Sequence, residues 1–301
     1  MDGASGRAAA RARRRGGLVR GPARPGPGRG RDAAPRVAAA LPAARTSGGQ
    51  RNRGGGRTVR QGVFDEPVRT LFLDAGNTLV GLDHDWIAQQ LAAIGIALDP
   101  RQLERAEAAA RPAVSRALGR HGTTEGRDAF AIYLDAIAAE LERRGAIAAR
   151  DRARLARDLL PRLRDEGGPL RLWGRPLPGA REALERAAER GIGRVVVSNS
   201  DGTVHTLLER AGMLPWIEHV VDSHHVGAEK PDPAIFRHAL AISGADPRTT
   251  LHVGDLYHAD IVGAHRAGLR AVLLDPFGDW NGVEAPTVPD VRTLVQRITA
   301  G

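Results

Sequence analysis

The 301-residue sequence contains no cysteine and only one lysine, Lys230, among its 44 basic residues. Without cysteine, a disulfide framework, a thiol nucleophile and a thiolate-bound metal are all excluded. The single lysine excludes any chemistry that needs two of them. No apolar run approaches the ~20 residues of a membrane-spanning helix. We therefore expect a soluble, cytoplasmic protein that does not contact a membrane, as a monomer or a weak dimer.

Basic charge is concentrated near the start of the chain. Residues 1–62 carry 15 Arg against Asp2 and Asp32, a net charge of +13, and residues 63–301 carry a net charge of −4. The first segment is rich in Arg, Ala, Gly and Pro and has no aromatic residue, so we predict that it is disordered. Contact with nucleic acid or a partner, an organelle transit peptide, a weak signal-peptide core and a translated stretch without function all stay open for this tail. Because the remainder is acidic, we do not expect the folded part to bind nucleic acid.

The hydrophobic pattern after the tail predicts a strand, a group of helices and then a regular alternation. Residues 68–73 form a short apolar run that ends in Asp74, which is typical of a buried strand. Across residues 86–165 apolar residues recur at spacings of three and four, which predicts amphipathic helices without an intervening strand. The remaining predicted elements are helix 180–190, strand 192–197, helix 203–211, strand 217–221, helix 233–243, strand 250–254, helix 259–267 and strand 270–274.

Strands separated by helices of about ten residues are typical of βαβ units. We therefore predict an α/β protein with a Rossmann-like core, in which a parallel sheet is formed by residues 63–81 and 173–301. Residues 82–172 form a helical domain inserted after the first strand. Trp86 and Trp173 flank this insertion, and we expect them to pack at its hinge.

Polar side chains follow several of the predicted strands or precede a helix. Because the carboxyl ends of parallel strands lie at one edge of a sheet, we expect these side chains to share a pocket. Clustered carboxylates repel one another unless a cation neutralises them, and oxygen ligands favour Mg²⁺. A phosphate that bridges the cation, a hydroxyl and an ammonium group would complete the charge balance. The residues are Asp74, Ser198, Asn199, Lys230, Asp255 and Asp260.

These motifs, in this order, resemble the haloacid dehalogenase superfamily, in particular its phosphatase-like branch with a helical cap after the first strand. The resemblance covers about residues 68–275. It implies that residues 82–172 are a mobile cap that shapes specificity. It also implies Mg²⁺-dependent hydrolysis of a small phosphorylated metabolite through a phosphorylated aspartate.

The resemblance assigns a role to each matching residue. Asp74 is implied as the catalytic nucleophile, and Lys230 as the catalytic cation that neutralises both the nucleophile and the phosphate. Ser198 is implied to bind the transferring phosphoryl group. Thr78 and Asn199 are implied to orient their neighbours around the substrate. The implied metal ligands are Asp74, the backbone carbonyl of Gly76, Asp255 directly or through water, and Asp260 in support.

One position departs from the pattern. The phosphatases of the superfamily usually carry a second Asp two positions after the nucleophile, which protonates the leaving group and then activates water. This sequence has Gly76 there, followed by Asn77, a residue that tolerates a left-handed backbone. We therefore predict that the loop geometry is kept and that a general acid/base contributing ~10²–10⁴-fold is lost.

Three explanations of this loss stay open. A residue of the cap takes over the role, the leaving group is a good one such as an acyl phosphate, or the protein is a slow phosphate-binding or regulatory relative. The cap candidates are Asp83, His84, Asp85 and His121. A 2-haloacid dehalogenase is the alternative enzyme, although that branch needs no metal and lacks the arrangement of Asp255 and Asp260. The phosphonatase branch uses a lysine of its cap in catalysis. Residues 82–172 contain no lysine, so this branch is excluded.

Overall fold

The computed structural model describes residues 62–121, 127–165 and 168–300. The tail that we predict to be disordered therefore lies outside the described residues, apart from Gly62. No helix in the described ranges combines the length and the apolar character needed to cross a membrane.

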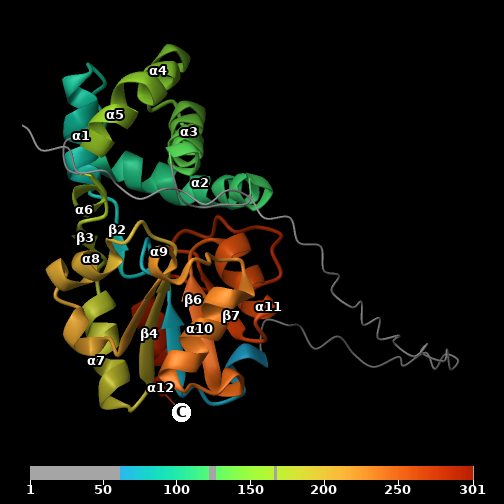
Figure 1. The fold of residues 1–301 in the computed structure, drawn as a ribbon. Helices are drawn as coiled ribbons and strands as arrows, with labels where there is room; N and C mark the ends of the chain where they lie inside the picture. Colours follow the sequence, from blue (N-terminus) through green and yellow to red (C-terminus); the bar gives the residue numbers. More distant parts are fainter. Residues whose placement is uncertain (1–61, 122–126, 166–167, 301) are drawn as a thin grey trace, which may run out of the picture. The chain divides into compact units, whose positions relative to one another are not determined.

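A six-stranded sheet forms the centre of the described chain (Figure 1). Its order is β5-β4-β1-β6-β7-β8, and every neighbouring pair of strands is parallel. This confirms the predicted α/β class and its parallel sheet. The strands are β1 (Thr70–Leu73), β4 (Gly193–Ser198), β5 (His219–Asp222), β6 (Thr250–Gly254), β7 (Arg270–Leu274) and β8 (Thr287–Val288).

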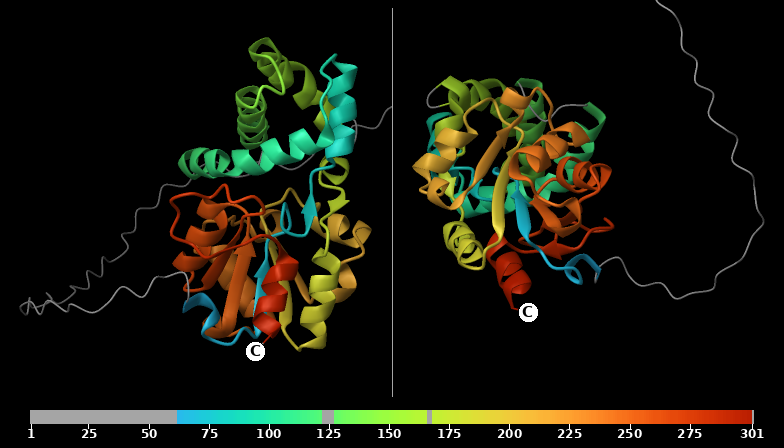
Figure 2. Two further views of the ribbon diagram at one scale, coloured as in Figure 1. Left: turned by 180° about the vertical axis from the view of Figure 1, so that it is seen from behind. Right: turned by 60° about the horizontal axis from the view of Figure 1, so that its bottom comes forward.

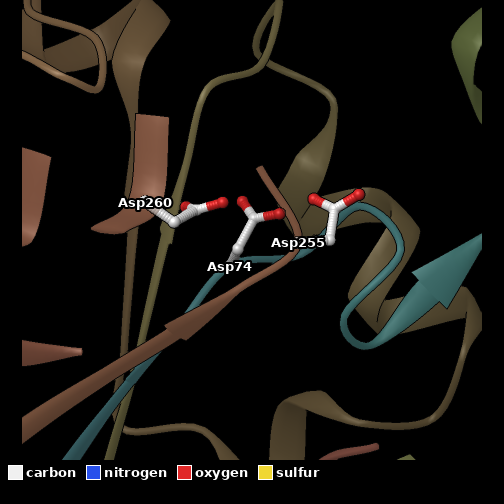
Figure 3. A group of neighbouring side chains, drawn as sticks. All are labelled: Asp74, Asp255 and Asp260. Carbon is white, nitrogen blue, oxygen red and sulfur yellow. The ribbon is translucent and has the colours of Figure 1, made fainter. Parts of the chain in front are cut away.

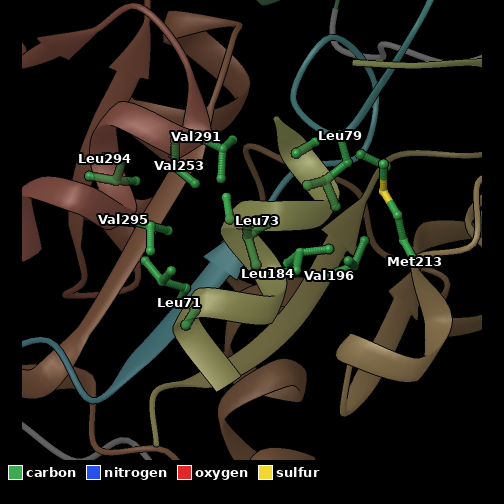
Figure 4. Close-up of a cluster of buried hydrophobic side chains, with 14 of the residues drawn as sticks. Leu71, Leu73, Leu79, Leu184, Val196, Met213, Val253, Val291, Leu294 and Val295 are labelled. Atoms are coloured by element: carbon green, nitrogen blue, oxygen red, sulfur yellow. The ribbon is translucent and has the colours of Figure 1, made fainter. Parts of the chain in front are cut away.

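Helices cover both faces of this sheet, because its strands are apolar on both sides. In β1, Leu71 and Leu73 pack into one hydrophobic cluster and Phe72 packs into another, as the two-residue period of a strand requires. The first cluster also contains side chains of α7 (Ala180–Glu189), α8 (Val204–Arg210) and α12 (Val291–Thr299), and Figure 4 shows several of them. The second contains side chains of α10 (Pro233–Ser243) and α11 (Gly263–Arg266), and Figure 2 shows the helix layers from further sides.

A helical segment separates β2 (Val80–Gly81) from β3 (Arg175–Pro176), and these two short strands pair antiparallel. The chain therefore leaves the sheet domain through β2 and returns to it through the adjacent strand β3. We call the intervening helices the helical insertion. It has a hydrophobic core of its own, which includes Trp86, Leu134 and Leu159. Its elements are α1 (His84–Ala93), α2 (Pro100–His121), α3 (Arg127–Arg143), α4 (Ala149–Arg154), the π-helical turn η2 (Leu155–Leu159), α5 (Leu160–Asp165) and α6 (Gly168–Leu172).

Several features of the fold were not predicted, among them the following three. Strands β2, β3 and β8 have two residues each, which is too short for a hydrophobic period to be visible. The start of helix α12 is marked in the sequence by Asp290, a residue type that favours helix N-termini. Its side chain caps the helix by accepting a hydrogen bond from the Thr293 amide at 2.6 Å. The predicted helix 259–267 begins instead as the π-helical turn η5 (Tyr257–Val262), which continues into α11.

Candidate active site

The carboxyl ends of three adjacent strands, β4, β1 and β6, lie beside one another. Leu73 of β1 is in register with Val196 of β4 and Val253 of β6, and the Asp74 amide donates to the Val253 carbonyl at 2.9 Å. The residues that follow these strands, among them Asp74 and Asp255, therefore meet at one edge of the sheet. All of them line one pocket, as predicted from the strand ends.

Lys230 sits between two carboxylates in this pocket. Its Nζ atom lies 2.6 Å from Asp74 Oδ1 and 2.7 Å from Asp260 Oδ1, and its side chain is only 3 % exposed. Burial opposes the charge on Lys230, but Asp260 and then Asp74 raise its pKa, so the ammonium group stays protonated at neutral pH. Burial likewise opposes ionisation of Asp260, but Lys230 holds its pKa well below the usual range. Lys230 and Asp260 are therefore both charged at neutral pH and form a buried ion pair.

The Asp260 carboxylate is fixed from several sides. Its Oδ2 accepts from the Leu256 amide at 2.9 Å, and its Oδ1 lies 3.0 Å from His252 Nε2. A Cβ atom at Gly254 would lie 2.2 Å from Asp260 Cγ, so this close approach requires glycine at position 254. The π-helical turn η5 carries Asp260, and such turns often occur at functional sites. Asp260 is therefore built to hold Lys230 in place.

Three carboxylates converge at the sheet edge (Figure 3). Asp74, Asp255 and Asp260 each offer an oxygen within 4.8 Å of the others. Burial raises the pKa of Asp74 to about 6, and Asp260 adds to this effect while Lys230 opposes it. Burial also raises the pKa of Asp255 to about 8, with further contributions from Asp74 and Asp260 against the opposing Arg111. One ammonium group does not balance this charge, and an all-oxygen donor set fits Mg²⁺.

These shifts predict how stability depends on pH. An acid whose pKa is raised on folding stabilises the fold at low pH, and this contribution is lost as the pH rises through the folded-state value. In the presence of EDTA, the free energy of unfolding should therefore fall as the pH rises from 3.8, the ordinary pKa of an aspartate, to about 8, the raised pKa of Asp255. Added Mg²⁺ should restore stability at the upper end, because it binds the ionised carboxylates.

Thermal unfolding measured across this pH range, with EDTA or with Mg²⁺, checks the prediction. The Asp255→Asn variant is the matched control, because it removes the larger of the two raised values and should flatten the pH dependence. An unfolding temperature in EDTA that does not change with pH, together with no response to Mg²⁺, would contradict it.

Other predicted site residues surround the carboxylates. Ser198 is buried and lines the pocket. The Asn199 side chain holds the backbone of Lys230, since it accepts from the Lys230 amide at 2.7 Å and donates to the Lys230 carbonyl at 2.8 Å. Thr78 is buried, but its side chain does not line the pocket, and its Oγ1 has no hydrogen-bond partner within the described ranges.

A second polar cluster, which the sequence did not reveal, joins the helical insertion to the sheet edge. Glu107 of α2 accepts from Arg111 Nε at 2.8 Å, from Arg111 Nη2 at 2.7 Å and from the Tyr133 hydroxyl at 2.5 Å. Asn77 Nδ2 lies 3.0 Å from Glu107 Oε1 and 3.1 Å from Asp255 Oδ2. Arg111 Nε also lies 3.5 Å from Asp255 Oδ2. We call Asn77, Glu107, Arg111 and Tyr133 the bridging cluster.

The bridging cluster does not supply the missing acid. Burial would raise the pKa of Glu107, but Arg111 outweighs it and Tyr133 helps, so that the pKa is lowered and the carboxylate is ionised. Burial raises the pKa of Tyr133 well above its usual value, and Glu107 adds to this effect. The tyrosine hydroxyl therefore remains protonated and bonded to Glu107. The bridging cluster therefore has no proton to donate, and its charged groups position Asp255.

None of the sequence-predicted substitutes that the structure describes reaches the pocket. Asp83 caps α1 by accepting from the Trp86 amide at 2.9 Å, and His84 Nδ1 lies 3.0 Å from Arg175 Nη1. Neither these two nor Asp85 lines the pocket. The side chain of His121 lies outside the described residues.

An indole ring covers Gly76. Three ring atoms of Trp173 would lie 3.5–3.8 Å from a Cβ atom at position 76, so any longer side chain there would meet this ring. Trp173 packs against the core of the insertion, which resembles the hinge role expected of it. It also lines the pocket, which was not expected. The space at position 76, two residues after Asp74, is thus filled by an aromatic side chain rather than by a carboxylate.

The site is thus a pocket in an α/β protein, where a central strand of a parallel sheet is followed by a buried aspartate paired with lysine. The model of the haloacid dehalogenase-like hydrolase family matches residues 68–268, so the chain belongs to that family and is an enzyme. This confirms the resemblance that the strand-end motifs indicated.

Individual relatives agree with this assignment. The chain is 30% identical over 210 residues to haloacid dehalogenase-like hydrolase domain-containing protein 3 of Bos taurus, covering 69% of this chain and 82% of the relative. It is 34% identical over 110 residues to a ribulose-1,5-bisphosphate 5-phosphatase of Halopiger xanaduensis, covering 36% and 46%. A magnesium-bound HAD hydrolase structure from Bacillus subtilis shares the fold, with a TM-score of 0.51 at 20% identity over 77% of this chain and 99% of that one.

Proposed function

We propose that this hydrolase is a Mg²⁺-dependent phosphatase that acts on a small phosphorylated metabolite through a phosphorylated Asp74. The observation that carries the proposal is the contact of 2.6 Å between the buried Asp74 carboxylate and Lys230, beside two further carboxylates. Partial matches to relatives named as phosphatases support it, including a glyceraldehyde 3-phosphate phosphatase of Pyrococcus abyssi at 36% identity over 100 residues, covering 33% of this chain and 42% of that relative.

The proposed reaction has two displacements at phosphorus. An Asp74 oxygen attacks phosphorus, and the bond to the leaving oxygen breaks with its electron pair going to that oxygen. Water then attacks the phosphorylated aspartate, the bond between phosphorus and Asp74 breaks, and the carboxylate is regenerated. One proton of the water ends on the released phosphate and the other on the leaving group.

The surrounding residues have distinct roles in this proposal. Lys230 neutralises Asp74 and the incoming phosphate together, and the Ser198 hydroxyl donates to a phosphoryl oxygen. Asp74, the Gly76 carbonyl and Asp255, with Asp260 in support, would hold Mg²⁺, which would supply positive charge to offset that of the phosphoryl group. The helical insertion acts as a cap that excludes water and shapes the substrate pocket.

Phosphate release by the full chain tests the proposal. We expect turnover of at least one ester or anhydride among small phosphomonoesters and acetyl phosphate, with dependence on Mg²⁺. The Asp74→Asn variant keeps the shape of the side chain but removes the nucleophile, so it should abolish turnover. A folded wild-type protein that binds Mg²⁺ but releases no phosphate from any of these compounds would contradict the proposal.

Gly76 favours one second candidate, a phosphate-binding or regulatory relative with little catalysis. That candidate predicts binding of Mg²⁺ and phosphate without turnover. The dehalogenase alternative predicts halide release from a 2-haloacid in the absence of metal. The same protein samples therefore separate the three functions.

A further inference from the structure

The pocket above the carboxylates has a polar floor and an apolar wall. It encloses about 390 Å³, a size typical of sites for small organic molecules. The floor carries Asp74, Ser198 and Lys230, and the wall is formed by the helical insertion and α8. Wall residues include Leu118, Phe130, Leu163, Trp173, Val204 and Leu207.

The wall offers few free partners for a polar substrate. Of its polar side chains, Tyr133 bonds to Glu107 at 2.5 Å and Thr203 bonds to Asp201 at 2.6 Å. Beyond the acidic residues and Lys230 at the floor, the described pocket is also lined by Ser200 and by the exposed charged residues Arg164 and Asp201. A sugar phosphate would place several hydroxyl groups against the apolar side chains of this wall, which is costly for each hydroxyl that finds no partner. An apolar group would instead be stabilised by the wall.

The ring systems on the wall favour a flat substrate group. Tyr133 and Trp173 are stacked, with their ring centres 6.2 Å apart, and Phe130 lines the same pocket. Aromatic side chains of this kind bind other rings by edge or offset contacts. Trp173 also covers Gly76, so its ring lies next to the place where a leaving group departs.

The missing acid restricts the leaving group as well. No carboxylate stands at position 76, Glu107 is held ionised, and the Tyr133 hydroxyl is committed to Glu107. Since none of the described groups at position 76 or in the bridging cluster is available as an acid, a leaving oxygen would depart as an anion and take its proton from water afterwards. A phenolate does this readily, whereas an aliphatic alkoxide needs an acid.

We propose that the preferred substrates are aryl phosphates, in which a phenolic oxygen links an apolar ring to the phosphate. This rests on the proposed phosphatase function and names its substrate class. In the first step Asp74 attacks phosphorus, the bond between phosphorus and the phenolic oxygen breaks, and the phenolate carries away the electron pair. The substrate ring packs against Phe130 and Trp173 of the apolar wall, and its phosphate lies on the polar floor.

A four-substrate comparison in Mg²⁺ tests polarity and leaving-group quality separately. Phenyl phosphate is apolar with a good leaving group, benzyl phosphate is apolar with a poor one, acetyl phosphate is polar with a good one, and glyceraldehyde 3-phosphate is polar with a poor one. We expect phenyl phosphate to have the highest kcat/KM, by about 10- to 200-fold over acetyl phosphate, the range typical of discrimination by an apolar pocket. We also expect it to exceed benzyl phosphate by roughly 10²-fold or more.

Variants connect the preference to the wall. Phe130→Asn should lower kcat/KM for phenyl phosphate about tenfold more than for acetyl phosphate, because only the ring reaches this wall. Phe277 is 50% exposed and does not line the pocket, so Phe277→Asn is the matched control and should leave the ratio unchanged. Binding of phenylphosphonate to Asp74→Asn, measured by calorimetry, should exceed binding of glycerol 3-phosphate and needs no turnover.

The outcomes distinguish the two proposals. If glyceraldehyde 3-phosphate, acetyl phosphate or benzyl phosphate is hydrolysed as well as phenyl phosphate, the aryl assignment is wrong while the phosphatase function stands. If neither these four compounds nor any other small phosphomonoester of the panel releases phosphate, the phosphatase function itself fails. Equal binding of the two non-hydrolysed ligands would overturn the apolar wall as a recognition surface.

Discussion

Lys230→Met should lower kcat/KM for phosphate release by roughly 10²–10³-fold, the usual effect of removing one preorganised electrostatic group from an active site. Lys230 Nζ contacts both Asp74 and Asp260, at 2.6 and 2.7 Å. Without the ammonium group, two buried carboxylates lose their shared counter-charge. The pKa of Asp74, already raised to about 6 by burial, should rise further, so that less of this proposed nucleophile is ionised at neutral pH.

The matched control is Lys230→Arg, which keeps the charge but cannot place it within the same narrow contact. It should retain folding better than Lys230→Met but recover little activity, because guanidinium and ammonium groups differ in shape.

Since Lys230 is the only lysine of the sequence, a lysine-selective reagent followed by mass spectrometry reports on this side chain and the amino terminus alone. Labelling of Lys230 should be slow and should stop when phosphate and Mg²⁺ are present. A Lys230→Met variant with near-normal kcat/KM would contradict the role.

The sheet edge was predictable from sequence because it depends on local patterns. An apolar run long enough for one strand, followed at once by Asp74 or by Asp255, places a carboxylate at a strand end whatever the rest of the chain does. The register of β1 with β4 and β6 then brings those ends together. The helix-flanked α/β class follows from the same alternation of short apolar runs and helices.

The bridging cluster was not predictable by that route. Glu107 and Arg111 are four residues apart on an amphipathic helix, a spacing that is common for exposed ion pairs. They are buried here because α2 approaches the loop after β1, and that approach depends on tertiary packing. One signal was available in retrospect: Ala106, Ala108 and Ala110 are all buried, and small side chains permit such close approach of a helix.

The role of Trp173 shows a related limit. Sequence placed this residue at a boundary between domains, where packing is the common explanation. Its contact with Gly76 depends on how β3 returns beside β2, and each of these strands has only two residues. Gly76 and Trp173 are thus two parts of one feature that are almost a hundred positions apart, and no local period connects them.

The second large effect is expected from Glu107→Leu, which should lower the free energy of unfolding by about 3–5 kcal/mol. This substitution removes the carboxylate that pairs with Arg111 at 2.7 Å and leaves a guanidinium group buried without its main partner. Chemical denaturation of the full chain measures the change. Glu104→Gln is the matched control on the same helix, because Glu104 and its partner Arg175 are 39% and 37% exposed and such pairs contribute at most about 1 kcal/mol.

The double variant Glu107→Leu with Arg111→Leu separates the structural role of the cluster from its electrostatic role. Replacing both members of a buried ion pair by apolar residues is often neutral, so most of the stability should return. Activity should not return with it, because Arg111 lies 3.5 Å from Asp255 and opposes the rise in that carboxylate's pKa. Arg111 lowers the pKa of Asp255 by more than Glu107 raises it, so without both residues this pKa should climb above about 8. Mg²⁺ binding and turnover should then require a higher pH than in the wild type. If the double variant is stable and has the wild-type pH profile, Arg111 serves only to neutralise Glu107, and the bridging cluster is packing rather than part of the active site.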